Sequence, residues 1–241
     1  MSEPAPPREA GEATPLEALY KRRFSDAERS AKNQVWQVLC TNFFSRYISP
    51  DATVLDIGAG YCEFINHISA KRRIALDANP DVTRLAAPSV EAICASVDNI
   101  HLLPEESIDV VFSSNFFEHL PNKTALSRLV EDTHRILRPG GRLIVMGPNI
   151  ACLPGKYWDY YDHHIPLTEK SVAELLSTSG YEVEESLARF VPYTVKGRLP
   201  MWPWLVRMYL LLGKITFRLF GKQFLVIARK AFNRSALAVR P

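Results

Sequence analysis

Two glycines one residue apart, placed directly after an apolar run, are the feature that most restricts the fold of this 241-residue chain. The run reads VLDIGAG at Val54–Gly60, and a second apolar run, ALDANP at Ala75–Pro80, contains Asp77 near its end. This layout predicts a strand, a tight turn, a helix and a second strand with an acid at its tip. Gly58 permits backbone angles that other residues avoid, and Gly60 lets backbone N–H groups approach a ligand. We expect a nucleoside at the carboxyl edge of a parallel sheet, with Asp77 accepting hydrogen bonds from ribose hydroxyls.

The residue at position 63 distinguishes between two kinds of nucleoside cofactor. A dinucleotide fingerprint has a small residue three positions after the second glycine, so that the helix N-terminus can bind a pyrophosphate. This chain has Glu63 there. A carboxylate at that point would repel two phosphates but not a zwitterionic amino acid. The predicted ligand is therefore adenosine joined to an amino acid rather than NAD or FAD.

Two later segments extend this pattern: IDVVFSSNFFEHL at Ile108–Leu120 and HRILRPGGRLIVMGPN at His134–Asn149. Together with the glycine turn they resemble the class I S-adenosylmethionine (SAM)-dependent methyltransferases, of the type 11/23-like kind. The resemblance implies an α/β fold with a Rossmann-like, doubly wound sheet of seven strands. The sheet would be mostly parallel, with the last strand antiparallel between the fifth and sixth. It also implies SAM as the cofactor and methyl transfer as the reaction (EC 2.1.1.-).

The resemblance also implies which residues contact the cofactor. Asp98 follows the third predicted strand, where the family has an acid that reaches the adenine amino group. Taken alone, this aspartate fits a helix cap or a turn equally well. Ser114 and Asn115 end the fourth strand, beside the methionine part of the cofactor. The full set of cofactor candidates is Asp56, Gly58, Ala59, Gly60, Asp77, Ala78, Asn79, Val97, Asp98, Ser114 and Asn115.

Methyl transfer depends mainly on alignment, and a general base assists when the nucleophile is a hydroxyl. The segment Tyr157–His164 reads YWDYYDHH, and its aromatic, acidic and imidazole side chains without periodicity predict a pocket-lining loop. His163 or His164 is the expected base, oriented by Asp162 or Asp159. The alternative is that these side chains only anchor the loop. The candidate catalytic residues are His163, His164, His119 and Asp162.

Glu118 and His119 also match part of an E-x-x-E-H motif with which some sugar-hydroxyl or catechol methyltransferases bind a divalent ion. Asn115 stands in place of the first acid, and an amide is a poorer ligand for a hard cation than a carboxylate. A later histidine completes the site in the small-RNA 2′-O-methyltransferases, and Asp162–His164 would supply one here. We predict a site without metal, with Glu118 and His119 as the alternative ligands.

Charge is distributed unevenly along the chain. Eleven of the 29 Lys and Arg residues, but none of the 26 acids, lie from Ser186 onward. Within the insertion Val191–Gln223, the stretch from Pro203 reads as one helix that is apolar nearly all round. Such a helix fits an anionic membrane surface, or alternatively a cap that packs on the sheet or on a second subunit. Its narrow basic stripe consists of Arg207, Lys214 and Arg218, and Trp202 and Trp204 stand at its start.

The predicted organisation is a single α/β core with flanking segments, because 47% hydrophobic residues in a chain of this length can fill one core. Tyr20 and Phe24 either contact the cofactor or pack in the core. Scattered cysteines, and the absence of a secretory or membrane-spanning apolar segment, indicate a cytoplasmic protein, peripheral at the inner membrane surface at most. The expected parts are a disordered tail (1–14), a helical cap (15–48), a methyltransferase domain (49–231) that contains the insertion (191–223), and a C-terminal tail (232–241).

The expected function is SAM-dependent methyl transfer to an O or N nucleophile of a small molecule, or of a sugar on a lipid or phosphate carrier. One alternative is a non-catalytic SAM-binding or membrane-surface adaptor module, and another is a metal-dependent sugar-hydroxyl methyltransferase. A nucleic-acid substrate is disfavoured because Ser114–Phe117 reads SNFF rather than Asn/Asp-Pro-Pro-aromatic. The basic segment also lacks the interleaved polar residues of a strand-binding groove. The sequence does not predict an oligomeric state.

Overall fold

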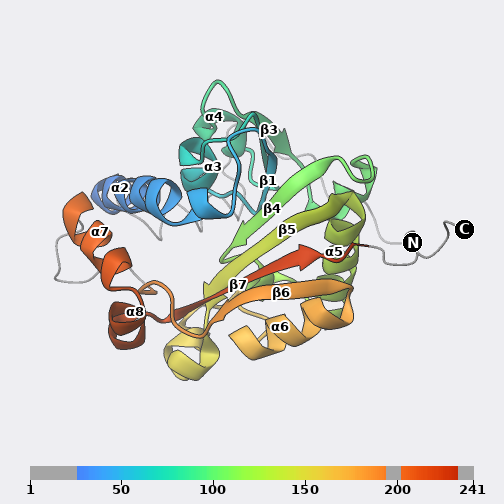
Figure 1. Cartoon of the computed structure of the whole chain (residues 1–241). Helices are drawn as coiled ribbons and strands as arrows, with labels where there is room; N and C mark the ends of the chain where they lie inside the picture. Colours follow the sequence, from blue (N-terminus) through green and yellow to red (C-terminus); the bar gives the residue numbers. More distant parts are fainter. Residues whose placement is uncertain (1–25, 194–201, 233–241) are drawn as a thin grey trace, which may run out of the picture.

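The structure is a computed structural model that describes residues 26–193 and 202–232. Its centre is a seven-stranded sheet in the order β3-β2-β1-β4-β5-β7-β6 (Figure 1). Neighbouring strands from β3 to β5 are parallel, whereas β7 is antiparallel to both β5 and β6. The predicted insertion of an antiparallel last strand is therefore confirmed. The strands are β1 Thr53–Ile57, β2 Arg72–Asp77, β3 Glu91–Cys94, β4 Ile108–Ser114, β5 Leu137–Pro148, β6 Tyr181–Leu187 and β7 Gln223–Lys230.

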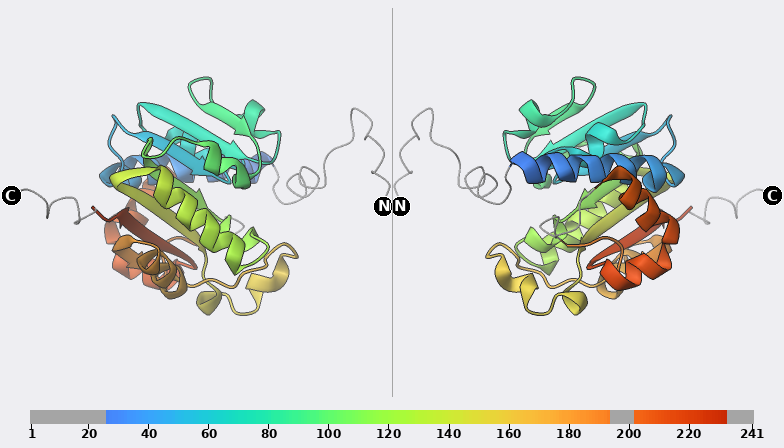
Figure 2. Two further views of the ribbon diagram at one scale, coloured as in Figure 1. Left: turned by 90° about the vertical axis from the view of Figure 1, so that its right-hand side faces the viewer. Right: turned by 90° about the vertical axis from the view of Figure 1, so that its left-hand side faces the viewer.

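Helices cover both faces of the sheet, as expected for strands that are joined by crossover helices. One layer contains α2, α3, α4, α7 and α8, and the other contains α5 and α6 (Figure 2). The helices are α2 Asp26–Asn42, α3 Glu63–His67, α4 Val82–Leu85, α5 Lys123–Ile136, α6 Glu169–Thr178, α7 Pro203–Leu212 and α8 Lys214–Phe220. The short 3-10 helices are η1 Phe44–Arg46, η2 Val97–Leu102, η3 Phe117–His119, η4 Ile150–Cys152 and η5 Lys156–Asp159.

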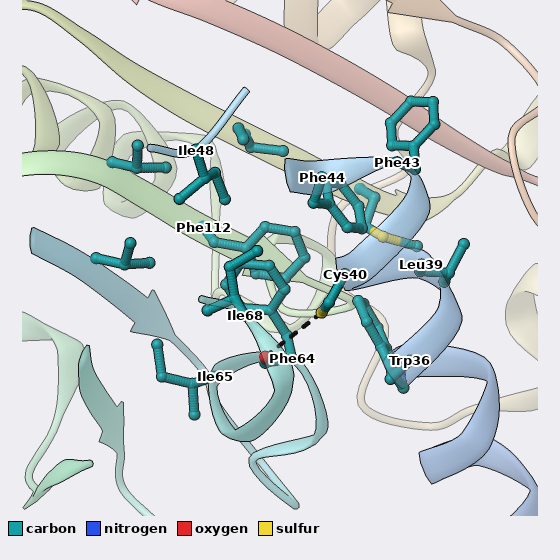
Figure 3. Close-up of a cluster of buried hydrophobic side chains, with 14 of the residues drawn as sticks. Trp36, Leu39, Cys40, Phe43, Phe44, Ile48, Phe64, Ile65, Ile68 and Phe112 are labelled. Atoms are coloured by element: carbon teal, nitrogen blue, oxygen red, sulfur yellow. Dashed lines mark hydrogen bonds between the residues drawn. The ribbon is translucent and has the colours of Figure 1, made fainter. Parts of the chain in front are cut away.

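An aromatic cluster joins the N-terminal helix to the sheet (Figure 3). Phe112 of β4 stacks on Phe64 of α3, with ring centroids 3.6 Å apart. Trp36 of α2 meets Phe112 edge-on at 5.8 Å, and Phe44 does so at 5.3 Å. Edge-to-face and offset arrangements of this kind stabilise aromatic pairs beyond the area they bury. The helix that precedes β1 is therefore an integral part of the core.

Some helix boundaries follow the predicted signals closely. Asn122 caps α5 through a bond from the Ala125 N–H to its side chain, and Thr168 forms a capping box with Ser171 at the start of α6. Such caps accept hydrogen bonds that the first helical turn cannot make internally. The sequence predicts the Thr168 cap, with Glu169 and Ser171 in the first helical turn. For the earlier helix it predicts a start at Pro121, two residues before the observed start at Lys123.

Three expectations about elements need correction. The stretch after Pro203 is two helices rather than one, because Gly213 (φ 45°, ψ −112°) leaves the helical region between α7 and α8. The sequence RPGG at Arg138–Gly141 reads as the end of the preceding helix, with the strand starting at Arg142, but it belongs to β5. Cys94 is exposed, while Cys40 and Cys62 are buried as expected of free thiols.

The N-terminal cap is described only in part. Helix α2 and η1 confirm helical structure from Asp26 to Arg46, while Tyr20 and Phe24 lie outside the described residues. The expected tail at 1–14 also lies outside them. Among the residues that the structure describes, no helix is long and apolar enough to cross a bilayer.

Candidate active site

The cofactor and acceptor candidates follow the carboxyl ends of neighbouring parallel strands, so the sheet brings them to one edge (Figure 1). The order of strands reverses at β1, which pairs with β2 on one side and β4 on the other. A crevice outside the carboxyl ends at such a switch point is where open α/β sheets bind ligands. The glycine turn follows β1, Asp77 ends β2, and Ser114 ends β4.

The glycine turn after β1 has the backbone conformation that the sequence predicts. Gly58 (φ 67°) and Gly60 (φ 52°) are both in the left-handed region. A Cβ on Gly58 would lie 2.5 Å from the ring of Phe116, so this position has no room for a side chain. The Gly58 N–H donates to the Leu76 carbonyl at 2.9 Å, which joins the turn to β2. Gly58 is therefore required both by its dihedral angles and by the close approach of Phe116.

Asp77 is held at the tip of β2 by two backbone donors. The Gly60 N–H donates to Oδ2 and the Asn79 N–H to Oδ1, both at 2.7 Å. Each carboxylate oxygen has a second lone pair and can accept a further hydrogen bond from a ligand. The carboxylate is thus oriented by the same turn that would carry the ligand.

Buried acids gather beneath the turn. Burial raises the pKa of Asp56 well above its usual range, and the nearby Asp77 and Glu63 raise it further. Burial also raises the pKa of Asp77, although the two backbone hydrogen bonds oppose the shift. Glu63, however, forms an ion pair with Lys32 of α2 at 3.0 Å. This pairing weakens the repulsion that the sequence argument assigned to Glu63, because a cation beside it offsets its charge.

Asp98 lies in η2, immediately after β3, and is exposed at the same edge. Ser96, not Asp98, is the residue that caps η2: its hydroxyl accepts from the Asp98 N–H at 3.3 Å. The Ser96 hydroxyl also lies 2.9 Å from Asp98 Oδ2 and donates to it. Neighbouring candidates differ in burial, since Asn79 is buried whereas Ala78 is exposed.

Asn115, directly after β4, adopts a positive φ of 52°. Only a few non-glycine residues do so, and such backbone strain concentrates at ligand sites. Its N–H donates to the Met146 carbonyl at 2.9 Å, and its side-chain amide donates to the Ser114 hydroxyl at 3.0 Å. Cys62, at the start of α3, also has a positive φ, of 60°. The spacing of residues gives no direct signal for either strained position.

The structure brings three of the four catalytic candidates together. His119 Nδ1 lies 2.9 Å from the carbonyl oxygen of Asp162 and 3.2 Å from its Oδ2. The His119 and His163 rings are 4.9 Å apart, and the His163 ring also stacks on Tyr160. His164 is exposed, and its backbone N–H donates to the Glu118 carbonyl at 2.8 Å. Asp162, expected to orient His163 or His164, contacts His119.

Glu118 is the group whose environment the sequence did not reveal. Its side chain is only 2% exposed, and Oε2 has no hydrogen-bond partner among the described residues. Burial raises the pKa of Glu118 to about 8, and the negative charge of Asp162 adds to this shift. A hydrogen bond from the backbone of Glu118 itself acts in the opposite direction. One ligand atom from each of Glu118, His119 and His163 lies within 4.8 Å of the others. This is the spacing of a cluster that can hold a metal ion.

Comparison with known proteins agrees with this layout. A family model described as "Methyltransferase domain" matches residues 55–145. A protein of Mycolicibacterium smegmatis named "Probable S-adenosylmethionine-dependent methyltransferase" is 31% identical over 159 residues, which are 64% of this chain and 60% of that protein. Residues 55–145 are thus similar to a methyltransferase domain, and the chain resembles a SAM-dependent methyltransferase over a longer stretch. It spans about three fifths of the length of that relative.

Solved structures show the same fold at low sequence identity. A SAM-dependent methyltransferase from Archaeoglobus fulgidus superposes with a TM-score of 0.63 at 20% identity, covering 88% of this chain and all of that one. A chain from the complex of the Haloferax volcanii Trm112 methyltransferase activator with a methyltransferase gives 0.62 at 15% identity, covering 89% and 96%. These similarities confirm the class I methyltransferase fold.

The match to a methyltransferase domain and the similarity to a SAM-dependent methyltransferase support SAM as the cofactor, as predicted. The family match runs from β1 into β5, so it contains the glycine turn, Asp77 and the Glu118–His119 pair. Asp162 and His163 lie outside it. The matched segment thus contains the cofactor half of the site, whereas the loop after β5 follows it.

Proposed function

We propose that the chain is a SAM-dependent methyltransferase that methylates an O or N nucleophile of an acceptor bound beside η3 and the loop after β5. The observation that carries the proposal is the orientation of Asp77. Its two oxygens accept from Gly60 and Asn79, and each keeps a lone pair for a ribose hydroxyl. The turn that supplies the Gly60 donor has no room for a side chain at Gly58, where a Cβ would lie 2.5 Å from the Phe116 ring.

The residues present fit an adenosyl amino acid. Asp77 would hold the ribose, Val97 and Asp98 would border the adenine, and Ser114 and Asn115 would border the amino-acid part. When bound, SAM supplies a methyl group on a sulfonium centre, which is a good leaving group. The chain's own contribution is to orient both reactants and to accept a proton from the acceptor.

His119 is the general base that the geometry favours. Asp162 Oδ2 lies 3.2 Å from His119 Nδ1, and Glu118 Oε1 lies 4.0 Å from Nε2. A neutral imidazole that donates from Nδ1 can take up a proton at Nε2 from a hydroxyl or amine. His163 lines the same cluster beside it. We infer an acceptor that is a small molecule, or a sugar on a lipid or phosphate carrier. The polar side chain of His163 lies beside His119 and also beside the aromatic rings of Tyr157 and Tyr160, which suits an acceptor with both polar and apolar parts.

Calorimetric titration with SAM tests the cofactor site. Asp77→Ala should weaken SAM binding by about 100-fold, since two hydrogen bonds to a charged acceptor are lost. Asp77→Asn should give a smaller loss, because the amide keeps one acceptor. Glu131→Ala, at an exposed position on α5, is the control and should bind as the unmodified protein does. Equal affinity for all variants that remain folded would remove Asp77 from the site.

Methyl transfer is tested with SAM labelled in the methyl group and fractionated cell extracts. Once a labelled acceptor is found, His119→Ala should lower kcat by about 100-fold or more. Asp162→Asn should lower it less, and the control Lys170→Ala, at an exposed position on α6, should leave it unchanged. SAM binding without labelling of any fraction would favour a non-catalytic SAM-binding module instead.

A metal-dependent sugar-hydroxyl methyltransferase is the second candidate, favoured by the proximity of Glu118, His119 and His163. These residues would hold a divalent ion that polarises an acceptor hydroxyl. Titration with Mn²⁺ or Zn²⁺ alone should then show one site, lost in Glu118→Gln and kept in Glu174→Gln. Full activity after chelation, together with no binding of either ion, would exclude the metal-dependent mechanism in favour of the metal-free one.

A further inference from the structure

A wide apolar face on α7 and α8 remains uncovered by the fold. Eight of the twelve large apolar or aromatic side chains that are exposed in the described part of the chain lie on this short stretch. Leu211 is the most exposed of them, at 78%. We call this set the α7–α8 face: Trp202, Trp204, Met208, Leu211, Leu212, Ile215, Leu219 and Phe220. Exposed apolar patches of this kind mark interaction sites.

The opposite side of the two helices already holds them to the domain. Val206, Thr216 and Phe217 are buried, and Phe217 packs on Phe190 with ring centroids 5.2 Å apart. Tyr209 donates its hydroxyl to the Phe190 carbonyl at 2.6 Å. The helices therefore do act as a cap, but with a different side from the α7–α8 face. Packing on the sheet does not account for the exposed residues.

Basic side chains are interspersed with the α7–α8 face. Arg207, Lys214 and Arg218 are all exposed, and none of them forms an ion pair with any residue that the structure describes. The break at Gly213 divides them between two helices, yet each still adjoins exposed apolar residues. The chain has no acid from residue 186 onward, so nothing on this segment neutralises them.

Two surface hollows coincide with the face, and each combines cations with apolar walls. One, of about 660 Å³, lies between α2 and α7 and contains Arg46 and Arg207. The other, of about 590 Å³, is lined by Lys214, Ile215, Arg218 and Leu219. Such hollows match a lipid, whose phosphate would meet a guanidinium or ammonium group while its chains meet the apolar walls.

We propose that the α7–α8 face docks on the surface of an anionic lipid bilayer. Tryptophans at one end, aliphatic side chains along the middle and interspersed cations are the composition of interfacial helices. A second copy of this chain is the less favourable occupant, because a two-fold interface through the face would oppose Arg207, Lys214 and Arg218 with the same residues. The positive charge of the α7–α8 face therefore favours an anionic lipid surface over a second copy of the chain.

The docked face lies at the edge of the sheet that carries the candidate active site. Helix α8 leads directly into β7, whose first residue, Gln223, pairs with Pro148 at the carboxyl end of β5. The Asn149 N–H also donates to the Lys222 carbonyl at 3.0 Å. Figure 2 (right) shows α2, α7 and α8 together at this end of the molecule. Docking would bring the site edge toward the lipid headgroups, whether or not the acceptor is a lipid.

Co-sedimentation with vesicles tests the proposal. Vesicles of phosphatidylcholine with phosphatidylglycerol should bind the full chain at low salt and release it at high salt, whereas phosphatidylcholine alone should bind weakly. The triple variant Arg207→Glu/Lys214→Glu/Arg218→Glu should lower the partition coefficient by about 100-fold or more. The matched control, Lys71→Glu/Lys123→Glu/Arg128→Glu, changes net charge equally at exposed positions away from the α7–α8 face, and should bind as the unmodified chain does.

A second variant, Trp204→Ser/Leu211→Ser/Leu219→Ser, tests the apolar contribution and should also lose vesicle binding. These side chains are exposed, so its thermal unfolding should stay close to that of the unmodified chain. Sedimentation velocity distinguishes the rival occupant. A dimer that becomes a monomer in this variant, with no vesicle binding by the unmodified chain, would overturn the proposal. So would equal loss of binding in both charge-reversal variants.

Discussion

Glu118 is a carboxyl group that the fold keeps out of water. Its pKa of about 8, against an ordinary value of 4.5, means that the folded protein holds this proton where the unfolded chain has lost it. The protonated carboxyl therefore contributes its full share of the free energy of unfolding below about pH 4.5. This contribution falls as the pH rises toward 8. Glu118→Gln should therefore raise the stability at pH 7 to 8, on the order of a few kcal/mol.

Thermal unfolding across this pH range, in metal-free buffer, checks the effect. The difference in Tm between Glu118→Gln and the unmodified protein should widen from pH 5 to about pH 8. Glu174→Gln, on the exposed side of α6, should unfold in parallel with the unmodified protein. A constant difference across the range would mean that Glu118 titrates normally.

Asn115 provides a test of backbone strain. With φ at 52°, glycine should be accepted here without loss, whereas alanine should cost about 1 kcal/mol. Urea unfolding without SAM measures both, so that any role of Asn115 in binding does not enter. If Asn115→Ala and Asn115→Gly were equally stable, the left-handed conformation would not be a feature of this position.

At the scale of residues, the local structure of the proposed cofactor side was predictable from the sequence, whereas the contacts of the proposed acceptor side were not. Gly58 and Asp77 are recognisable because residue type and spacing alone define a glycine turn beside an acid-tipped strand. The pairing of His119 with Asp162 joins residues 43 positions apart, and only the folded loop brings them together. The burial of Glu118 was likewise hidden, because its neighbours in sequence are not its neighbours in space.

At the scale of elements, Gly213 separates two helices that hydrophobic pattern alone joins. Apolar periodicity continues on both sides of Gly213, so the glycine itself was the sequence signal for a helix break there. Its dihedral angles (φ 45°, ψ −112°) belong to a region that is nearly restricted to glycine. By contrast, the cap at Thr168 was predicted because its signal is local.

Gly213→Ala should lower the free energy of unfolding by about 1–3 kcal/mol. The nearest atom to an added Cβ would be the Leu210 carbonyl oxygen at 3.6 Å, so strain rather than a clash is the cause. Gly155→Ala is the matched control, because Gly155 has φ −87° and open space around it. Urea unfolding should show no loss in the control. Equal free energies of unfolding for the two variants would contradict the prediction that alanine is strained at position 213.

At the scale of the whole molecule, the aromatic cluster determines how the helical layer sits on the sheet. Phe112→Ala should reduce stability by about 3–5 kcal/mol, because it removes a fully buried ring that contacts Trp36, Phe44 and Phe64. Phe220→Ala removes an equal ring that is 50% exposed and should cost far less. Guanidinium unfolding of both variants measures the difference. Similar losses would place the cluster outside the stabilising core.

The strand order was predictable at this scale, since alternating strands and helices and the family resemblance both imply it. The position of α7 beside α2 was not, because it depends on side chains from distant parts of the chain that meet only after the sheet has formed. The same limit applies to the hollow that Arg46 and Arg207 share.

The place of β7 has a consequence for synthesis. The ribosome releases β6 and α6 well before β7, yet β6 reaches the sheet only through β7, which lies between it and β5. The strands from β3 to β5 can therefore assemble on the nascent chain, while the last two must wait and then enter together. A premature stop before Gln223 would release a chain with the edge of β5 open, which chaperones and proteases would be expected to recognise.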